Sequence, residues 1–413
     1  MINFEKFTLE NGLKVIVHRD TSTPIVSLNI LYDVGARDEQ PDKTGFAHLF
    51  EHLMFGGSVN IPKYDTPLEK AGGENNAFTT NDITNYYLTI PKPNLELGFW
   101  LESDRMFNLA FSEKSLEVQR QVVIEEFKQR YLNQPYGDVW LLLRPLVYTK
   151  HPYQWPTIGK EITHIENASM DDVKAFYKKF YNPSNAILSV AGDVTVEEIR
   201  ALCQKWFAPI ENHDEYTREI LPEPKQEEAR FLSVERNVPY DTIYKAYHMG
   251  KRTDSNYHCI DLISDILSNG DSSRLFIELV KNQKLFTSIN AYISGDCDNG
   301  LFIVNGKLAK NGTMEQAEAA IIRELEKIKS ELPDERELQK VKNKCESLLE
   351  FSELKVSDKA YNLAYYELLG DANLNNLEVN KYQAVSAEDV CLQAKELFKE
   401  TNCSTLHYLS NQK

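Results

Sequence analysis

The sequence predicts an α+β protein built from two similar domains, each with an antiparallel-rich sheet and helices packed on it. Its 413 residues exceed what one hydrophobic core usually serves, so two domains of roughly 200 residues are expected. A polar, acidic stretch with three prolines, residues 209–226, is typical of a linker between residues 1–208 and residues 227–413. The pattern of residues 169–173 (SMDDV) returns 217 positions later in residues 386–390 (SAEDV), which indicates a diverged repeat.

In the first domain, the Asn11-Gly12 pair is a strong turn signal between two short strands. A β-rich run follows Pro24 and ends near Val34, and Thr44 is the expected N-cap of the next helix. Apolar periodicity, glycines and prolines predict helices at 64–71, 95–108, 113–132, 137–147, 170–180 and 196–207, and strands at 75–80, 84–90 and 186–191.

In the second domain the same mixture of short strands and helices begins again after the linker. The hairpin between two of its strands is expected to turn at residues 296–300. The sequence predicts strands at 231–234, 242–247, 288–294, 301–306 and 404–409, and helices near 256–268, 272–281 and throughout 313–400.

Composition narrows the classes of partner. Hydrophobic residues at 42% and aromatic residues at 11% suit a packed globular protein. A net charge of −16 argues against nucleic acid or an anionic membrane as the main partner. This charge fits either positively charged substrates or simply a solvated acidic surface.

The cysteines and the chain start bear on the compartment. Six scattered cysteines without a C-x-x-C pair indicate reduced thiols instead of a disulfide framework. No apolar run approaches the 18 residues or so of a membrane span. Residues 1–7 show no signal sequence, so a cytoplasmic location is expected, or a periplasmic one if a leader has been removed.

The strongest chemical signal is the stretch His48-Leu49-Phe50-Glu51-His52. Residues four apart lie on one face of a helix, so both imidazoles can bind one metal ion, and Glu51 lies beside them as a base. With 9 histidines in 413 residues, a chance match is on the order of a few per cent. The alternative is a surface pair of histidines beside an acid. Because the neighbouring positions are apolar, the helix is expected to be buried and its polar groups to need partners.

A third ligand is expected from the long helix predicted at 113–132. A catalytic zinc site usually has three protein ligands, and Glu125 and Glu126 lie in the middle of this helix. Taken alone, the two carboxylates are more simply a solvated helix face. Next to the histidine pair, one of the two becomes the candidate ligand.

The chain resembles the inverted-zincin peptidases, a family that includes pitrilysin, insulysin and the mitochondrial processing peptidase. It is most similar to the short bacterial members with two domains that work as two-chain enzymes. The resemblance is carried in the family's order by residues 45–55, 72–80, 119–126, 181–186 and 272–275. It implies a zinc-dependent endopeptidase in which two such chains close like a clam shell around a chamber.

The resemblance implies one zinc ion per chain, held by His48, His52 and Glu126, with Glu51 as the general base. Glu126 fits the family's third ligand better than Glu125 does. Where the family usually has an outer carboxylate, this chain has Gln119, which can hydrogen-bond a ligand but adds no charge. The offset of the repeat places Asp265 opposite His48, so no zinc site is expected in the second domain.

The implied reaction is hydrolysis of peptide bonds in unfolded peptides. Glu51 would take a proton from water and later deliver it to the leaving amine. The strand at Asn76, Ala77, Phe78 and Thr79 would bind an extended substrate along its edge by backbone hydrogen bonds. The alternative is an ordinary edge strand of a half-buried sheet.

One departure from the family bears on the partner. Active members carry an Arg and a Tyr, seven residues apart, that steady the substrate, but this chain has Val280 and Thr287 at those positions. We therefore expect a metal-free homologous subunit to supply the pair in a heterodimer. A self-sufficient homodimer with other substrate-steadying residues is the second hypothesis. A non-catalytic scaffold is the third.

Overall fold

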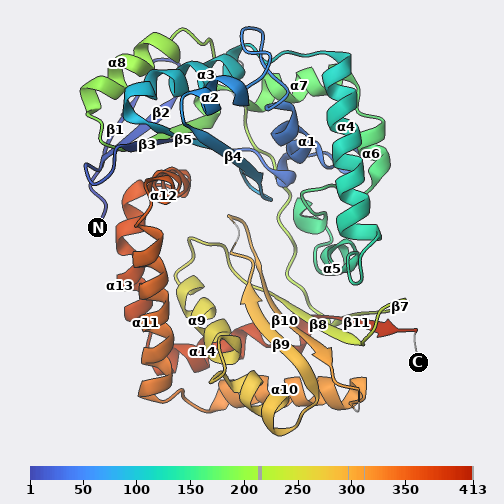
Figure 1. Ribbon diagram of the computed structural model, residues 1–413. Coiled ribbons are helices and arrows are strands. Elements are labelled where there is room, and N and C mark those ends of the chain that lie inside the picture. Colours follow the sequence, from blue (N-terminus) through green and yellow to red (C-terminus); the bar gives the residue numbers. More distant parts are fainter. Residues whose placement is uncertain (213–215, 296, 311, 412–413) are drawn as a thin grey trace. The chain divides into compact units, whose positions relative to one another are not determined.

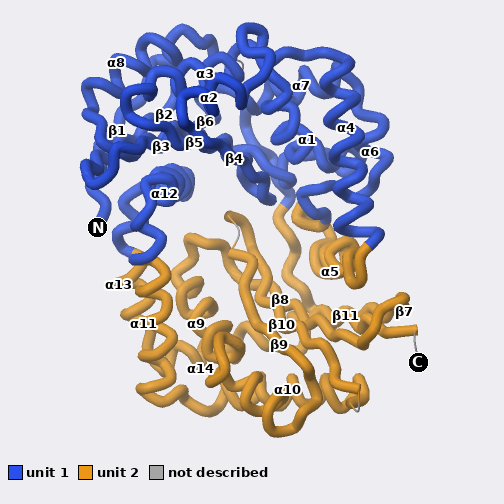
Figure 2. Tube along the Cα trace, viewed as in Figure 1, with its two compact units in different colours: residues 1–133, 155–221, 350–377 blue, residues 134–154, 222–349, 378–413 orange. Residues whose placement is uncertain are grey.

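The computed structural model describes residues 1–212, 216–295, 297–310 and 312–411. The chain forms two compact units, shown in different colours in Figure 2: residues 1–133, 155–221 and 350–377 in unit 1, and residues 134–154, 222–349 and 378–413 in unit 2. Residues 213–215 of the predicted linker and residue 296 of the predicted hairpin turn lie outside the described residues.

Unit 1 contains a six-stranded mixed sheet with the spatial order β1-β2-β6-β3-β5-β4 (Figure 1). β2 and β6 are parallel, and all other neighbours are antiparallel. The strands are β1 (Glu5–Thr8), β2 (Lys14–Arg19), β3 (Ile25–Tyr32), β4 (Glu74–Thr79), β5 (Thr84–Pro91) and β6 (Ala186–Gly192). β6 is buried along its whole length and β3 nearly so, as central strands covered on both faces should be.

The helices of unit 1 lie on both faces of this sheet, with α3 on one face and α12 on the other (Figure 1). They are α1 (Phe46–Leu53), α2 (Asp65–Lys70), α3 (Leu95–Phe107), α4 (Glu113–Phe127), α6 (Ile162–Glu166), α7 (Met170–Phe180), α8 (Val196–Trp206) and α12 (Val356–Leu368). The helix predicted at 113–132 is α-helical only to Phe127, and Lys128–Leu132 forms a wider π-helical turn.

Unit 2 contains a five-stranded mixed sheet with the order β7-β11-β8-β10-β9. Its strands are β7 (Arg230–Arg236), β8 (Thr242–His248), β9 (Phe286–Ile293), β10 (Leu301–Leu308) and β11 (Cys403–Ser410). Its helices are α5 (Val139–Val147), α9 (Tyr257–Ser268), α10 (Met314–Ser330), α11 (Glu335–Ser352, whose last turn belongs to unit 1), α13 (Glu378–Gln383) and α14 (Ala387–Leu397). The helix expected near 272–281 is a π-helical segment, Phe276–Asn282.

The two sheets share one topology. β2-β6-β3-β5-β4 of unit 1 matches β7-β11-β8-β10-β9 of unit 2, strand for strand, and in each sheet only the first pair is parallel. α7 and α14 carry the repeated pattern, and each begins with a Ser and Asp capping box. The prediction of an α+β fold with two similar domains is therefore confirmed.

The compact units are not the two halves of the sequence, because each unit takes one helix from the other half. α5 lies before the predicted linker, yet it packs on β7, β8 and β11 of unit 2 through Val139, Leu143 and Val147. α12 lies after the linker, yet it packs on β2, β3 and β6 of unit 1 through Ala360 and Leu363. Each exchanged helix covers a sheet face that would otherwise expose apolar side chains to water.

Candidate metal centre

The helix that carries the histidine pair, α1, is held by burial of most of its surface. Phe46, Ala47, Leu49, Phe50 and Leu53 are all buried, as expected from its apolar composition. The polar side chains of His48, Glu51 and His52 therefore share the remaining face of the helix. This arrangement follows from the helical period, which places residues three and four apart on one side.

The prediction that Thr44 is the N-cap of α1 is wrong. The helix begins after Gly45, whose φ of 89° is left-handed and suits glycine, and no side chain of the N-cap residue accepts a bond. Thr44 lies one residue earlier, and its hydroxyl is 2.8 Å from Nδ1 of His164 and accepts the N–H of Lys160. The acceptor for the first turn is instead the carboxylate of Glu39, which bonds the N–H groups of Gly45 and Ala47.

His48, His52 and Glu126 lie together. The two imidazole rings are 4.9 Å apart and nearly perpendicular. Oε2 of Glu126, on α4, is 3.6 Å from Nε2 of His48 and 3.5 Å from Nε2 of His52. The side chain of Glu125 is 59% exposed and pairs with Lys128 instead. Within the part of the chain that the structure describes, this is the one group of three potential ligands close enough to hold a metal ion.

The protonation states of His48 and Glu126 favour the binding of a cation. Burial lowers the pKa of His48 to about 4, so its imidazole is neutral at pH 7. The hydrogen bond with His52, together with the charge of Arg130, holds the pKa of Glu126 below its usual value, so this group is a carboxylate. Two neutral imidazoles and one carboxylate are the donors that zinc prefers in catalytic sites. Nδ1 of His48 is buried and has no hydrogen-bond partner among the described residues.

Arg130 is a member of the centre that the sequence analysis missed. Its Nη1 is 2.9 Å from Oε1 of Glu126, whereas the imidazoles lie near the other oxygen, Oε2. The signal was available in the sequence, since residues four apart on a helix can form an ion pair. Gln119 is half-buried on α4, and among the described residues no hydrogen bond joins it to the three candidate ligands, so its outer role stays a prediction.

Glu51 lies beside the ligand group on the same helix. The hydroxyl of Thr79 donates a hydrogen bond of 2.7 Å to Oε2 of Glu51. Burial raises the pKa of Glu51 above its usual value, while the bond from Thr79 acts in the opposite direction. Thr79 therefore orients a carboxylate that has a raised affinity for a proton, which is what a general base needs.

The predicted substrate strand is β4, which lies at one edge of the unit 1 sheet. It pairs with β5 on one side, and no other described strand pairs with it. Asn76 is exposed, whereas Ala77, Phe78 and Thr79 are half-buried. β4 also contacts α1, and Thr79 at its end bonds Glu51 on that helix.

The two positions that depart from the family lie in unit 2. Val280 packs against the core of that unit from the π-helical segment. Thr287 is exposed on β9, and its hydroxyl donates to the carbonyl of Lys307. Neither side chain can supply a positive charge or a phenol.

No helix among the described residues is both long and apolar enough to cross a lipid bilayer.

Two family models and several known proteins are similar to this chain. The sequence model described as insulinase, peptidase family M16, matches residues 14–139, and the one described as the peptidase M16 inactive domain matches residues 167–345. The zinc protease PqqE of Helicobacter pylori is 31% identical over 412 residues, covering 97% of this chain and 92% of that protein. The uncharacterized zinc protease YmxG of Bacillus subtilis is 25% identical, covering 96% of each chain.

Solved structures give the same result for the fold. The crystal structure of a protease from Helicobacter pylori has a TM-score of 0.93 and 30% identity, covering 99% of this chain and all of that one. The periplasmic protease PqqL from Escherichia coli has a TM-score of 0.81 at 18% identity, and this chain covers 48% of its length.

Proposed function

We propose that this chain, which belongs to peptidase family M16, is the zinc-bearing subunit of a metallopeptidase that cleaves unfolded peptides. The observation that carries the proposal is the meeting of His48, His52 and Glu126 beside Glu51. The curated relatives PqqE and YmxG, which match almost the whole chain, are named zinc proteases.

One zinc ion per chain would be held by Nε2 of His48, Nε2 of His52 and Oε2 of Glu126. These three atoms face one another, and their donor types fit zinc. When bound, zinc supplies a Lewis acid that polarises the scissile carbonyl and makes water a better acid. Arg130 holds Oε1 of Glu126 and so leaves Oε2 directed at the imidazoles.

Glu51 acts as the general base. Its carboxylate takes a proton from the attacking water and then delivers that proton to the leaving amine. Thr79 donates to one oxygen of Glu51, so the other oxygen is the one that exchanges the proton. Burial supports this role, since it raises the affinity of the carboxylate for the proton it must carry.

The substrate is an extended peptide that adds to the edge of β4. The substrate would pair with those backbone groups of Asn76, Ala77, Phe78 and Thr79 that β5 leaves unbonded. In this structure the N–H of Ala77 donates to Oδ1 of Asn76 at 2.8 Å. Backbone pairing tolerates many side chains, which suits a peptidase for unfolded peptides. Thr79 belongs to this strand and also bonds Glu51, so the strand and the base are linked through one side chain.

A metal-free homologous subunit would complete the enzyme. Val280 and Thr287 support this, because they replace the charged and phenolic groups that steady substrates in active relatives. A homodimer with other steadying residues is the second candidate. A non-catalytic scaffold is the third, and it does not require that the ligand group and the base remain together.

The experiment is hydrolysis of a mixed set of quenched fluorescent peptides by the purified chain, with zinc content measured on the same sample and Glu51→Gln as control. Zinc-loaded but inactive protein supports a missing subunit. Activity that is lost in Glu51→Gln supports the homodimer and argues against the heterodimer. Protein with neither zinc nor activity contradicts the metallopeptidase.

A further inference from the structure

The start of α1 is held by a buried carboxylate from outside the helix. The first turn of a helix leaves backbone N–H groups without partners, and Gly45 has no side chain to satisfy them. Oε2 of Glu39 accepts the N–H of Gly45 and Oε1 accepts the N–H of Ala47, each at 2.9 Å.

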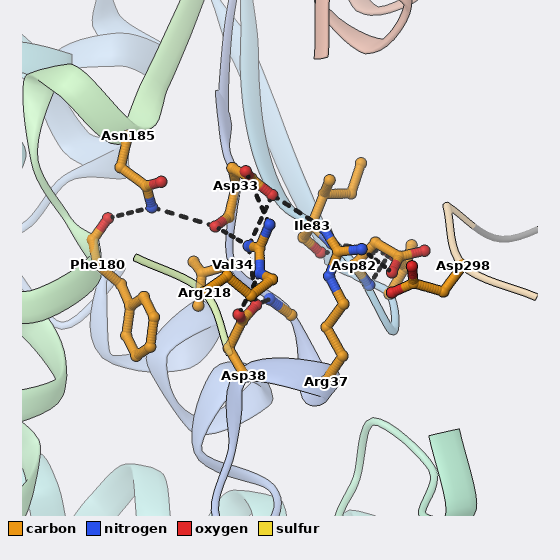
Figure 3. A network of polar contacts seen from close by, with 12 residues as sticks. Asp33, Val34, Arg37, Asp38, Asp82, Ile83, Phe180, Asn185, Arg218 and Asp298 are labelled. Atoms are coloured by element: carbon orange, nitrogen blue, oxygen red, sulfur yellow. Dashed lines mark hydrogen bonds and ion pairs between the residues drawn. The ribbon is translucent and has the colours of Figure 1, made fainter. Parts of the chain in front are cut away.

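A network of ion pairs holds residues in the loop directly before Glu39 (Figure 3). Arg218 bonds Asp33 at 2.8 Å and Asp38 at 2.7 Å. Arg37 bonds Asp33 at 3.1 Å and Asp82 at 3.0 Å. The residues directly before Glu39 are therefore tied to the end of β3, to the turn after β4 and to the segment around Arg218.

Burying this carboxylate is costly. Glu39 is only 7% exposed, and burial raises its pKa to about 8. A Ser, Thr, Asp or Asn at the N-cap position would satisfy the first turn at a lower cost, as Ser169 does for α7. A local cap, however, moves with its own helix. Glu39 instead follows directly on residues that are held by ion pairs, so its two bonds tie the start of α1 to that loop.

The position of α1 decides the geometry of the ligands. Ala47, whose N–H bonds Glu39, directly precedes His48, and His52 follows one turn later. Glu126 comes from another helix, so a shift of α1 along its axis changes both nitrogen-to-oxygen distances together. Catalytic constellations require placement within about 0.5 Å, which helix packing alone does not guarantee.

We propose that Glu39 is a positioning residue of the metal centre, which fixes the start of α1 and thereby the places of His48 and His52 opposite Glu126. The inference rests on the proposed function, because it assigns Glu39 a role in zinc binding. Glu39 touches neither the ligands' side chains nor the reacting atoms, so it acts only through the helix.

The test is Glu39→Gln in the full chain, with Asp389→Asn as a control for loss of a carboxylate at the start of a helix without candidate ligands. The glutamine has the same size but only one acceptor oxygen, so its NH₂ group opposes one of the two backbone N–H groups. Asp389 is an exposed carboxylate in the capping box at the start of α14 in unit 2, a helix without candidate ligands. Zinc affinity by competition with a chromogenic chelator, kcat, KM and Tm are measured on each protein.

We expect Glu39→Gln to weaken zinc binding about 10- to 100-fold, as loss of a ligand-orienting group does, and to lower kcat at saturating zinc with KM nearly unchanged. Asp389→Asn should leave zinc affinity unchanged. The proposal is overturned if folded Glu39→Gln binds zinc like the wild type. It is also overturned if Glu39→Gln fails to fold where Asp389→Asn folds, because Glu39 would then serve the whole core.

The outcomes separate this proposal from the proposed function. A wild-type chain that binds zinc but cleaves no peptide by itself indicates that the second subunit is missing, and the zinc affinities still decide the role of Glu39. A wild-type chain that binds no zinc contradicts both.

Discussion

Replacing Glu126 by Gln should remove most of the zinc affinity, and replacing Glu125 should not. Glu126→Gln deletes a negative charge that lies 3.5 Å from Nε2 of His52. Coulomb's law at an effective dielectric constant of about 20 gives about 5 kcal/mol for a unit charge at this distance. Since about 1.4 kcal/mol corresponds to a tenfold change, affinity for a divalent ion should fall more than about a thousandfold.

Glu125→Gln is the matched control, because it makes the same chemical change one residue away. Its exposed ion pair with Lys128 contributes about 0–1 kcal/mol, so zinc affinity should stay within about fivefold of the wild type. Both variants are compared with the wild type by chelator competition and by calorimetric titration with zinc. The reasoning is refuted if Glu126→Gln stays within tenfold of the wild type, or if the two variants lose equal affinity.

Three further changes test separate parts of the structure. Thr79→Val should lower kcat at least about tenfold without weakening zinc binding, because a hydrogen bond to the charged Glu51 contributes about 1.5–3 kcal/mol; steady-state kinetics with unchanged kcat would contradict this. His407, together with Lys245, lowers the pKa of Glu318 to about 2 from its ordinary 4.5, so this stabilisation is complete above pH 4.5 and disappears as the pH falls towards 2. Urea unfolding between pH 3 and pH 7 should therefore show a shallower pH dependence for Glu318→Gln, and identical slopes would count against the ion pair. Leu363→Ala should cost about 2–5 kcal/mol of unfolding free energy, because this fully buried side chain belongs to the unit 1 core, and a loss below about 1 kcal/mol would argue that α12 is not part of that core.

The sequence alone determined the class of fold and the identities of the candidate ligands. The spacing of His48 and His52 depends only on the period of a helix, and the apolar residues between them required that this helix be buried. The choice between Glu125 and Glu126 did not follow from spacing, because adjacent residues on a helix face different directions and only packing decides which one points inward. The resemblance to a family favoured Glu126, and in the structure its carboxylate lies against the two imidazoles.

Only the tertiary structure decided the features that depend on residues far apart in the chain. Glu39 and the network around Arg218 left no local signal, since a buried carboxylate in a loop has the same sequence pattern as a solvated one. The exchange of α5 and α12 between the two halves of the sequence also could not be predicted from the sequence pattern. Either helix presents an apolar stripe, and nothing within the stripe specifies which sheet it covers. Local periodicity therefore determines whether a segment forms a helix or a strand. The burial of complementary apolar surfaces determines which sheet that segment packs on, and this depends on residues far apart in the chain.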